Sequence, residues 1–101
     1  MAVKDGALEF EWDNGNLDKS RRKHGVTPPE SESVFADEES IILPDKEHSI
    51  VEERFAIFGK SDLNRYLYVI FIIRRKRIRI ISARRMHREE VGKYAKIKKD
   101  T

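Results

Sequence analysis

Hydrophobic and polar positions alternate along several short stretches of this chain, and each stretch predicts a strand. Residues 8–12 alternate apolar with acidic side chains, which is typical of a strand with one buried face. Residues 40–43 predict a second strand, which Pro44 ends because proline has no N–H for a ladder hydrogen bond. Three more strands are predicted at residues 54–59, 66–73 and 77–83. Because the stretch 66–73 is apolar at every position, we expect it to be the central strand.

A first helix is predicted over residues 17–24. Asp13 or Asn14 precedes it as a candidate cap, and Gly25 stands where a glycine commonly ends a helix. The residue types at both ends therefore favour a short helix directly after the first strand.

Two further helices are predicted from their start signals. Thr27 is a candidate N-cap, Pro28 suits the first helical position, and Glu30 completes the pattern of a capping box in a helix that ends near residues 35–36. The last helix, residues 87–98, has acidic residues in its first turn and lysines towards its end, as the helix dipole favours. The predicted order is βααββββα, an α+β fold with a small antiparallel sheet and about three helices.

The length of 101 residues indicates one small domain, which we place at residues 8–99 after a flexible N-terminal segment at 1–7. The longest apolar run has eight residues, against roughly 20 for a membrane-spanning helix. With Lys4 and Asp5 near the start, we expect no signal peptide and a cytoplasmic protein. The chain has no cysteine, no phosphate-binding P-loop motif and no metal-ligand motif. We therefore expect no cofactor and no metal ion.

Charge is divided unevenly along the chain. Residues 1–53 contain 14 Asp and Glu against 6 Lys and Arg, a net charge of −8, whereas residues 54–101 contain 4 against 15, a net charge of +11. Such a basic half attracts RNA, DNA or an acidic protein partner. The alternative is that the two halves neutralise each other within the fold.

Arginines stand within the predicted strand at 77–83. Strict alternation predicts two faces, with Arg77, Arg79, Ile81 and Ala83 on one and Ile78, Ile80, Ser82 and Arg84 on the other. An arginine among isoleucines is costly unless its guanidinium meets a carboxylate or a phosphate. Arg79 is therefore interpreted as a phosphate ligand or as the internal partner of Glu52.

Histidines and a carboxylate provide candidates for proton transfer. His48 lies in the polar loop at residues 45–53, four residues before Glu52, and histidine titrates nearest neutral pH. Glu52 and Arg54 share a face if this segment is extended, although they are equally an ordinary ion pair. His24 precedes Gly25, where a cation also stabilises a helix end.

Several blocks, in order and with matching spacing from about residue 8 to residue 97, resemble the BrnT family of ribonuclease toxins. They are Phe-Glu-Trp-Asp at 10–13, Arg-Lys-His-Gly-Val at 22–26, Val-Phe-Ala-Asp at 34–37, His-Ser at 48–49, Glu-Glu-Arg-Phe at 52–55, Gly59, and Ile-Arg-Ile-Ile-Ser-Ala-Arg at 78–84. The resemblance implies a RelE-like fold, in which helices pack on a twisted antiparallel sheet. It also implies a BrnA-like ribbon-helix-helix antitoxin as partner, in a heterotetramer.

Together, the residues and the resemblance predict a metal-independent endoribonuclease toxin that inhibits translation. The expected catalytic residues are His48, Glu52, Arg54, Arg79 and Arg84. The expected RNA contacts are Lys23, His24, Arg74, Arg75, Lys76 and Arg77. The alternative is a non-catalytic basic module that binds nucleic acid or an acidic protein partner.

Overall fold

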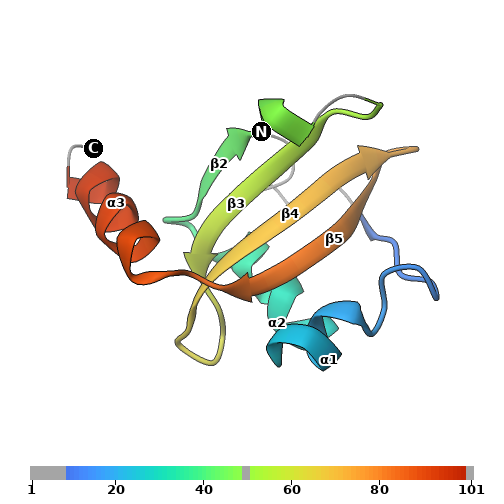
Figure 1. Cartoon of the computed structure of the whole chain (residues 1–101), viewed down its shortest axis with the longest axis horizontal. Helices are drawn as coiled ribbons and strands as arrows, with labels where there is room; N and C mark the ends of the chain where they lie inside the picture. The colour runs from blue at the N-terminus through green and yellow to red at the C-terminus, as the bar shows by residue number, and fades with distance from the viewer. Residues whose placement is uncertain (1–8, 49–50, 100–101) are drawn as a thin grey trace.

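The structure of the chain is a computed structural model that describes residues 9–48 and 51–99. It confirms the α+β class and the βααββββα order (Figure 1). In chain order the elements are β1 (Glu9–Phe10), α1 (Lys19–His24), α2 (Pro28–Ser33), the 3-10 turn η2 (Val34–Ala36), β2 (Ile41–Pro44), the 3-10 turn η3 (Lys46–His48), β3 (Arg54–Lys60), β4 (Tyr66–Arg74), β5 (Arg77–Arg85) and α3 (Arg88–Lys99). The proposed flexible segment at residues 1–7 lies outside the described residues, and the single domain at 8–99 stays a prediction.

The five strands form one sheet in the order β1-β5-β4-β3-β2, with the apolar strand β4 at its centre as predicted. Strands β2 to β5 pair antiparallel, but β1 runs parallel to β5. The sheet is therefore mixed, where the sequence predicted an antiparallel one. No short hairpin links β1 to β5, since most of the chain lies between them, and so the local turn signals do not set their relative direction.

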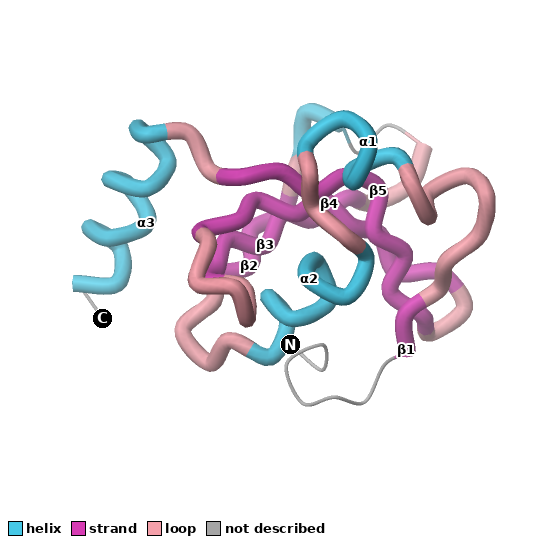
Figure 2. Tube along the Cα trace, turned by 90° about the horizontal axis from the view of Figure 1, so that it is seen from below, coloured by secondary structure: helices cyan, strands magenta, loops and turns pink. Residues whose placement is uncertain are grey.

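The hydrophobic core lies between the sheet and the segment that contains α1, α2 and η2 (Figure 2). The core face of the sheet contributes Ile57 from β3, Val69 and Phe71 from β4, and Ile78 from β5, all at most 1% exposed. Phe35 of η2 packs edge-to-face on Phe71, with ring centroids 5.0 Å apart. We call the opposite side of the sheet the outer face.

Helix α1 begins later than predicted. The expected caps, Asp13 and Asn14, lie in a turn in which the carbonyl of Asp13 accepts hydrogen bonds from the N–H groups of Asn16 and Leu17. Asp18 is the N-cap instead, and its carboxylate accepts a hydrogen bond from Arg21 Nε rather than from the backbone. The helix ends at Gly25 with φ of 69°, the left-handed conformation that glycine adopts without strain.

Helix α2 begins as predicted at its cap, because Thr27 Oγ1 accepts a hydrogen bond from the N–H of Glu30. The Glu30 carboxylate forms different bonds from those of a capping box. It accepts hydrogen bonds from Ser61 Oγ at 2.7 Å and from Arg65 Nε at 2.7 Å, and it is 2% exposed. This ion pair, in which the carboxylate is buried and Arg65 is partly exposed, attaches α2 to the turn between β3 and β4.

The side of β5 that faces away from β4 is covered by residues 11–20. They contribute one backbone N–H, one side-chain amide and one hydroxyl group. The N–H of Glu11 donates to the carbonyl of Ile78, and Asn16 Nδ2 donates to the carbonyl of Ile80. Further along, Ser20 Oγ accepts from the N–H of Ala83. These bonds satisfy backbone groups that an edge strand otherwise exposes to other chains.

A β-bulge interrupts β5. Phe71 pairs with Ile80 and Ile70 pairs with Ser82, so Ile81 is an extra residue. Beyond it the faces are exchanged: Ala83 is fully buried on the core face. The predicted strict alternation is therefore wrong after Ile80, and Arg84 lies on the outer face together with Arg79.

The hairpin between β4 and β5 turns through Arg75 and Lys76. Both residues have positive φ, 53° and 63°, although neither is glycine. Two consecutive residues of this kind correspond to a type I′ turn, in which Asn-Gly is the usual pair. The all-basic turn thus adopts a conformation that its residue types disfavour.

Helix α3 lies beyond the end of the sheet, away from α1 and α2 (Figures 1 and 2). Its main buried residue is Tyr94, which is 4% exposed and donates from its hydroxyl to the carbonyl of Glu39. Lys98 of α3 also forms an ion pair with Glu39. Within the described residues, no helix is long and apolar enough to cross a membrane.

Candidate functional site

Arginines from three adjacent strands gather on the outer face of the sheet. Arg54 of β3, Ile72 of β4 and Arg79 of β5 are direct cross-strand neighbours, so they form one row. Two strand spacings separate the Cα atoms of Arg54 and Arg79 by roughly 10 Å. Arg74 lies on the same face, two residues beyond Ile72. Three guanidinium groups therefore surround one apolar residue.

An open cavity of about 400 Å³ lies on this part of the face. We call it the arginine cavity, and its lining residues are Glu47, Val51, Glu52, Arg54, Ile72, Arg74 and Ile81. Two predicted catalytic residues, Glu52 and Arg54, thus line the same cavity. A third, Arg79, lies beside Ile72 of its lining.

Arg79 forms ion pairs with two carboxylates from the N-terminal part of the chain. Its Nη1 and Nη2 atoms lie 2.8 and 2.9 Å from the two carboxylate oxygens of Asp13, and Nη1 lies 3.2 Å from Glu11 Oε1. The hydrogen bonds from Arg79 lower the pKa of Asp13 below its usual value. The internal partners of Arg79 are therefore Asp13 and Glu11, rather than Glu52.

Glu52 pairs with Arg74 across the mouth of the cavity. Arg74 Nη2 lies 2.7 Å from Glu52 Oε1, and both side chains are about two-fifths exposed. The pKa of Glu52 is lowered, first by the hydrogen bond from Arg74 and also by the charges of Arg54 and Arg79. Glu52 is consequently an anion at neutral pH, held among three arginines.

Arg84 lies on the same face but outside the arginine cavity. Four strand rises separate it from Arg79, roughly 13 Å. Its guanidinium forms two hydrogen bonds to Glu90, of 2.8 and 3.0 Å, and lies over the ring of Tyr68 at 4.3 Å from the centroid. Arg84 is therefore a rigid, paired cation between β5 and α3.

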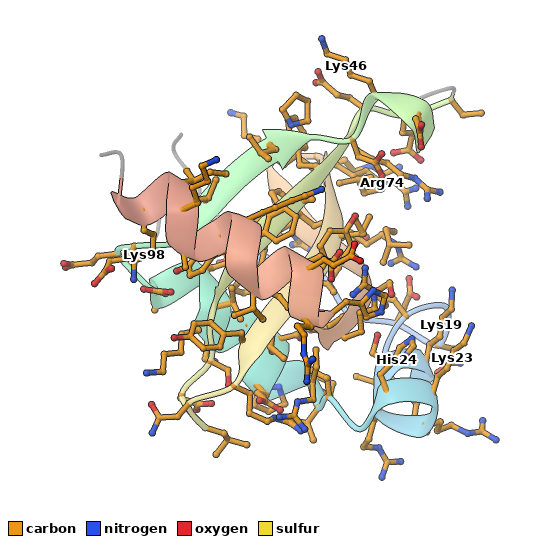
Figure 3. The ribbon with its side chains drawn as sticks, turned by 60° about the vertical axis from the view of Figure 1, so that its left-hand side comes forward. Lys19, Lys23, His24, Lys46, Arg74 and Lys98 are labelled. Atoms are coloured by element: carbon orange, nitrogen blue, oxygen red, sulfur yellow. The ribbon has the colours of Figure 1, made fainter. Side chains whose placement is uncertain are left out.

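The remaining predicted residues are distributed over the molecule. The backbone of His48 ends η3, and its side chain lies outside the described residues. Lys23 and His24 lie on α1, apart from Arg74 in Figure 3. The exposed residues at the tip of the β4–β5 hairpin are Arg75, Lys76 and Arg77. The structure thus brings Glu52, Arg54, Arg74 and Arg79 together and places Lys23 and His24 elsewhere.

Sequence reasoning missed the carboxylates that hold Arg79. The sequence marks Glu11 only as part of a half-buried strand and Asp13 only as a candidate helix cap. The parallel pairing of β1 with β5 brings them to Arg79, across a sequence separation of more than 60 residues. Among the described residues, no group of three or more His, Asp or Glu side chains is arranged to hold a metal ion.

The fold and this face define a small α+β protein whose sheet presents clustered guanidinium groups, the chemistry that recognises phosphate. The family model described as "Ribonuclease toxin, BrnT, of type II toxin-antitoxin system" matches residues 12–90. The chain therefore belongs to the BrnT family of ribonuclease toxins, as the sequence blocks predicted. This membership implies ribonuclease activity at the level of the family, and an antitoxin as partner. The comparison with curated proteins gives no match.

Proposed function

We propose that this chain is a metal-independent endoribonuclease that inhibits translation, and that the arginine cavity is its active site. The observation that supports this proposal is the convergence of Arg54, Arg74 and Arg79 around an open cavity that also holds the anion Glu52. Cations and a carboxylate in one cavity are the groups that RNA cleavage by an internal nucleophile requires.

In the proposed reaction, the 2′-oxygen of a ribose attacks the adjacent phosphorus. A bond from O2′ to phosphorus forms and the bond from phosphorus to O5′ breaks, which leaves a cyclic phosphate and a 5′-hydroxyl. One base accepts the proton of the 2′-hydroxyl, and one acid donates a proton to the leaving O5′. Arginines stabilise the additional negative charge on the phosphorane, so the proposal requires no metal ion for that role.

Each predicted residue has a proposed role in this scheme. His48 transfers protons, with Glu52 as the carboxylate that orients it. Arg54 and Arg79 hold the reacting phosphate, and Arg84 holds a phosphate further along the strand. The proposed contacts to the rest of the RNA are Lys23, His24, Arg74, Arg75, Lys76 and Arg77. The antitoxin that silences the enzyme is proposed to be a BrnA-like ribbon-helix-helix protein, in a heterotetramer.

The exchange of one anion for another gives Arg79 a defined role. Asp13 occupies both Nη atoms of Arg79 with the fork geometry that a phosphate also takes. Because Asp13 is half exposed, RNA phosphate can replace it without unfolding the core. Glu11 remains to hold the guanidinium in place.

Cleavage of total RNA by the purified protein tests the proposal. We expect cleavage between pH 5 and 9 that is unaffected by a chelator. Arg79→Ala should abolish cleavage while the domain stays folded, and Arg79→Lys should be impaired because lysine lacks the planar fork. His48→Ala should lower the rate by a factor on the order of 10² to 10⁴. Undiminished cleavage by Arg79→Ala, or loss of cleavage with chelator, contradicts the assignment.

A second candidate function is a non-catalytic module that binds nucleic acid through the same face. The observation that favours it is that Arg74, Arg79 and Arg84 each already pair with a carboxylate of this chain. RNA binding without any cleavage across the whole pH range would select this alternative.

A further inference from the structure

Helix α3 leaves an apolar groove between itself and the outer face of the sheet. The groove has a volume of about 320 Å³. It is lined by Ile41 and Leu43 of β2, Phe58 of β3, Tyr68 of β4, and Glu90, Lys93, Tyr94 and Ile97 of α3. We call it the α3 groove. Figure 3 views α3 with the sheet behind it.

The floor of the α3 groove is a row of three cross-strand neighbours. Ile41 pairs with Phe58, and Phe58 pairs with Tyr68. The rings of Phe58 and Tyr68 meet edge-to-face with centroids 4.8 Å apart. Because Arg84 lies over Tyr68 and is itself paired with Glu90, the floor is rigid before anything binds.

The wall of the α3 groove is one stripe of the helix, residues 90, 93, 94 and 97, which share a face at helical spacing. Only Tyr94 of this stripe is buried. At the mouth, Ile97 is 42% exposed and Leu43 on the opposite side is 44% exposed. Two large aliphatic side chains thus face each other across a space that no described residue fills.

Exposed cations outnumber exposed anions on α3 beside the groove, although Glu89 is exposed on the same helix and the charge of Asp45 acts on Tyr68 of the floor. Glu90 is neutralised by its two hydrogen bonds to Arg84. Lys93 forms no ion pair with any residue that the structure describes, and Arg88 and Lys96 are further exposed cations on the same helix. An occupant with apolar residues on one side and acidic residues beside them complements both properties.

We propose that the α3 groove is the docking site for an amphipathic, acidic segment of the antitoxin, which inserts apolar side chains between Leu43 and Ile97. This inference rests on the antitoxin that family membership implies, and not on the cleavage chemistry of the proposed function. RNA is the poorer occupant, because the groove is mostly apolar and Arg84, the arginine that lies over its floor, is already paired. A helix in an apolar groove is a common mode of recognition between proteins.

The α3 groove is separate from the arginine cavity, but both lie on the outer face. Four strand rises along β4 separate Tyr68 in the groove from Ile72 in the cavity, a distance of roughly 13 Å. An antitoxin segment anchored in the groove therefore extends over the cavity or stops just short of it. The anchor contributes affinity for the antitoxin and has no part in RNA cleavage.

Single substitutions at the mouth of the α3 groove separate antitoxin binding from RNA cleavage. The experiment measures, by calorimetry, the affinity of the purified toxin for the antitoxin encoded beside its gene. RNA binding, RNA cleavage and self-association are measured on the same samples. Leu43→Glu and Ile97→Glu should each weaken antitoxin binding by about 10-fold or more, since each places a charge in the apolar contact. Both variants should cleave RNA at the wild-type rate.

Matched controls use side chains of the same type elsewhere. Leu63→Glu changes a leucine that is 63% exposed in the turn after β3, and it should alter neither property. Lys93→Glu should weaken antitoxin binding, whereas Lys19→Glu on α1 should not. If a glutamate variant fails to fold, Leu43→Ala and Ile97→Ala provide the same comparison, with an expected weakening of several-fold.

Three results overturn the proposal. Wild-type affinity for the antitoxin in both groove variants shows that the antitoxin docks elsewhere. Weakened RNA binding with unchanged antitoxin affinity assigns the groove to RNA. Loss of self-association with unchanged antitoxin affinity assigns it to a second copy of the chain. Because binding is measured directly, an inactive wild-type protein contradicts the proposed function and leaves this test intact.

Discussion

Asp13 is the residue whose role differs most between the sequence and the structure. Its carboxylate pairs with both Nη atoms of Arg79, and its Oδ1 also accepts a hydrogen bond from the N–H of Gly15. The sequence marks Asp13 only as a turn or cap residue. In the structure it stands where the proposed function requires a phosphate, so Asp13 and RNA compete for the same donors.

The variant Asp13→Asn tests this competition. Asparagine keeps the side-chain oxygen for Gly15 but removes the negative charge, so we expect RNA affinity to rise by several-fold. The measurement is the Kd of the Asp13→Asn variant for RNA, compared with the Kd of the wild type, with Arg79 unchanged in both proteins. Asp18→Asn is the control, since Asp18 pairs with Arg21 on α1 and not with Arg79. Unchanged or lower RNA affinity in Asp13→Asn contradicts the idea of competing anions.

Glu30 shows a partner that local sequence cannot reveal. The spacing from Thr27 correctly placed the start of α2 but assigned the carboxylate to a capping box. Arg65, 35 residues away, takes the carboxylate because the β3–β4 turn brings it against the start of α2. The pKa of Glu30 is lowered, first by the hydrogen bond from Arg65, and then by that from Ser61.

This pKa predicts how stability depends on pH. The carboxylate binds a proton less readily in the folded state than in the unfolded state, where its usual pKa is 4.5. The contribution of the ionised carboxylate to the free energy of unfolding is therefore complete at pH values above 4.5. It is lost as the pH falls through the lower pKa of the folded state. We expect the free energy of unfolding of the wild type to fall below about pH 4.5, and Glu30→Gln to fall less.

Urea unfolding at pH 7 and in steps down to pH 3 measures this effect. At pH 7, Glu30→Gln should be less stable by about 1–3 kcal/mol, because it leaves Arg65 without its ionic partner. Glu38→Gln, a change at an exposed position, should follow the wild-type curve. Parallel curves for Glu30→Gln and the wild type contradict the assigned role of this ion pair.

At the scale of elements, sequence patterns locate strands and helices to within a few residues. The apolar run at 66–73 correctly predicted the central strand, and Gly25 correctly predicted the end of α1. The β-bulge at Ile81 was not predictable from alternation, because an extra residue changes the face of everything after it. The prediction that Arg79 and Arg84 lie on opposite faces failed for this reason alone.

The hydrogen bonds that Asn16 forms along the side of β5 give a testable prediction for this element. Asn16 is 5% exposed, and its Nδ2 donates to the carbonyls of Glu11 and Ile80. Asn16→Ala leaves those two carbonyls without this donor, so we expect a loss of about 1–3 kcal/mol in the free energy of unfolding. Asn14→Ala, two residues earlier and exposed, should cost little. Equal stability of both variants in urea contradicts the role of Asn16 in closing the sheet edge.

For the whole molecule, the two oppositely charged halves partly neutralise each other, as the alternative interpretation of the sequence predicted, while the attraction of the basic half for a polyanion stays a prediction. Acidic residues of the first half neutralise Arg65, Arg74 and Arg79 within the fold. The hairpin residues Arg75, Lys76 and Arg77 remain exposed at one end of the sheet. Net charge alone could not divide the arginines into these two groups, because the division depends on which strands become neighbours.

Salt dependence measures how many cations meet RNA. If four to six of the proposed contact residues bind phosphates, the slope of log affinity against log salt should be roughly −3 to −4 for a single strand. The double change Arg75→Asn and Lys76→Gly should make the slope less negative by about 1.4, because two phosphate contacts are lost. The change of Arg88 and Lys96 to glutamine, which removes the same charge from α3, should leave it unaltered. A slope near zero contradicts RNA binding by the basic face.

The turn at Arg75 and Lys76 also has a consequence for how this protein can be improved. A non-glycine residue in the left-handed region costs about 1 kcal/mol or more, and this turn contains two in succession. Asn-Gly suits such a turn, so Arg75→Asn with Lys76→Gly should resist heat better than the wild type. The same pair of changes removes two exposed cations of the hairpin. Selection for heat resistance would therefore favour Asn and Gly at these two positions, whereas selection for high RNA affinity would favour Arg and Lys.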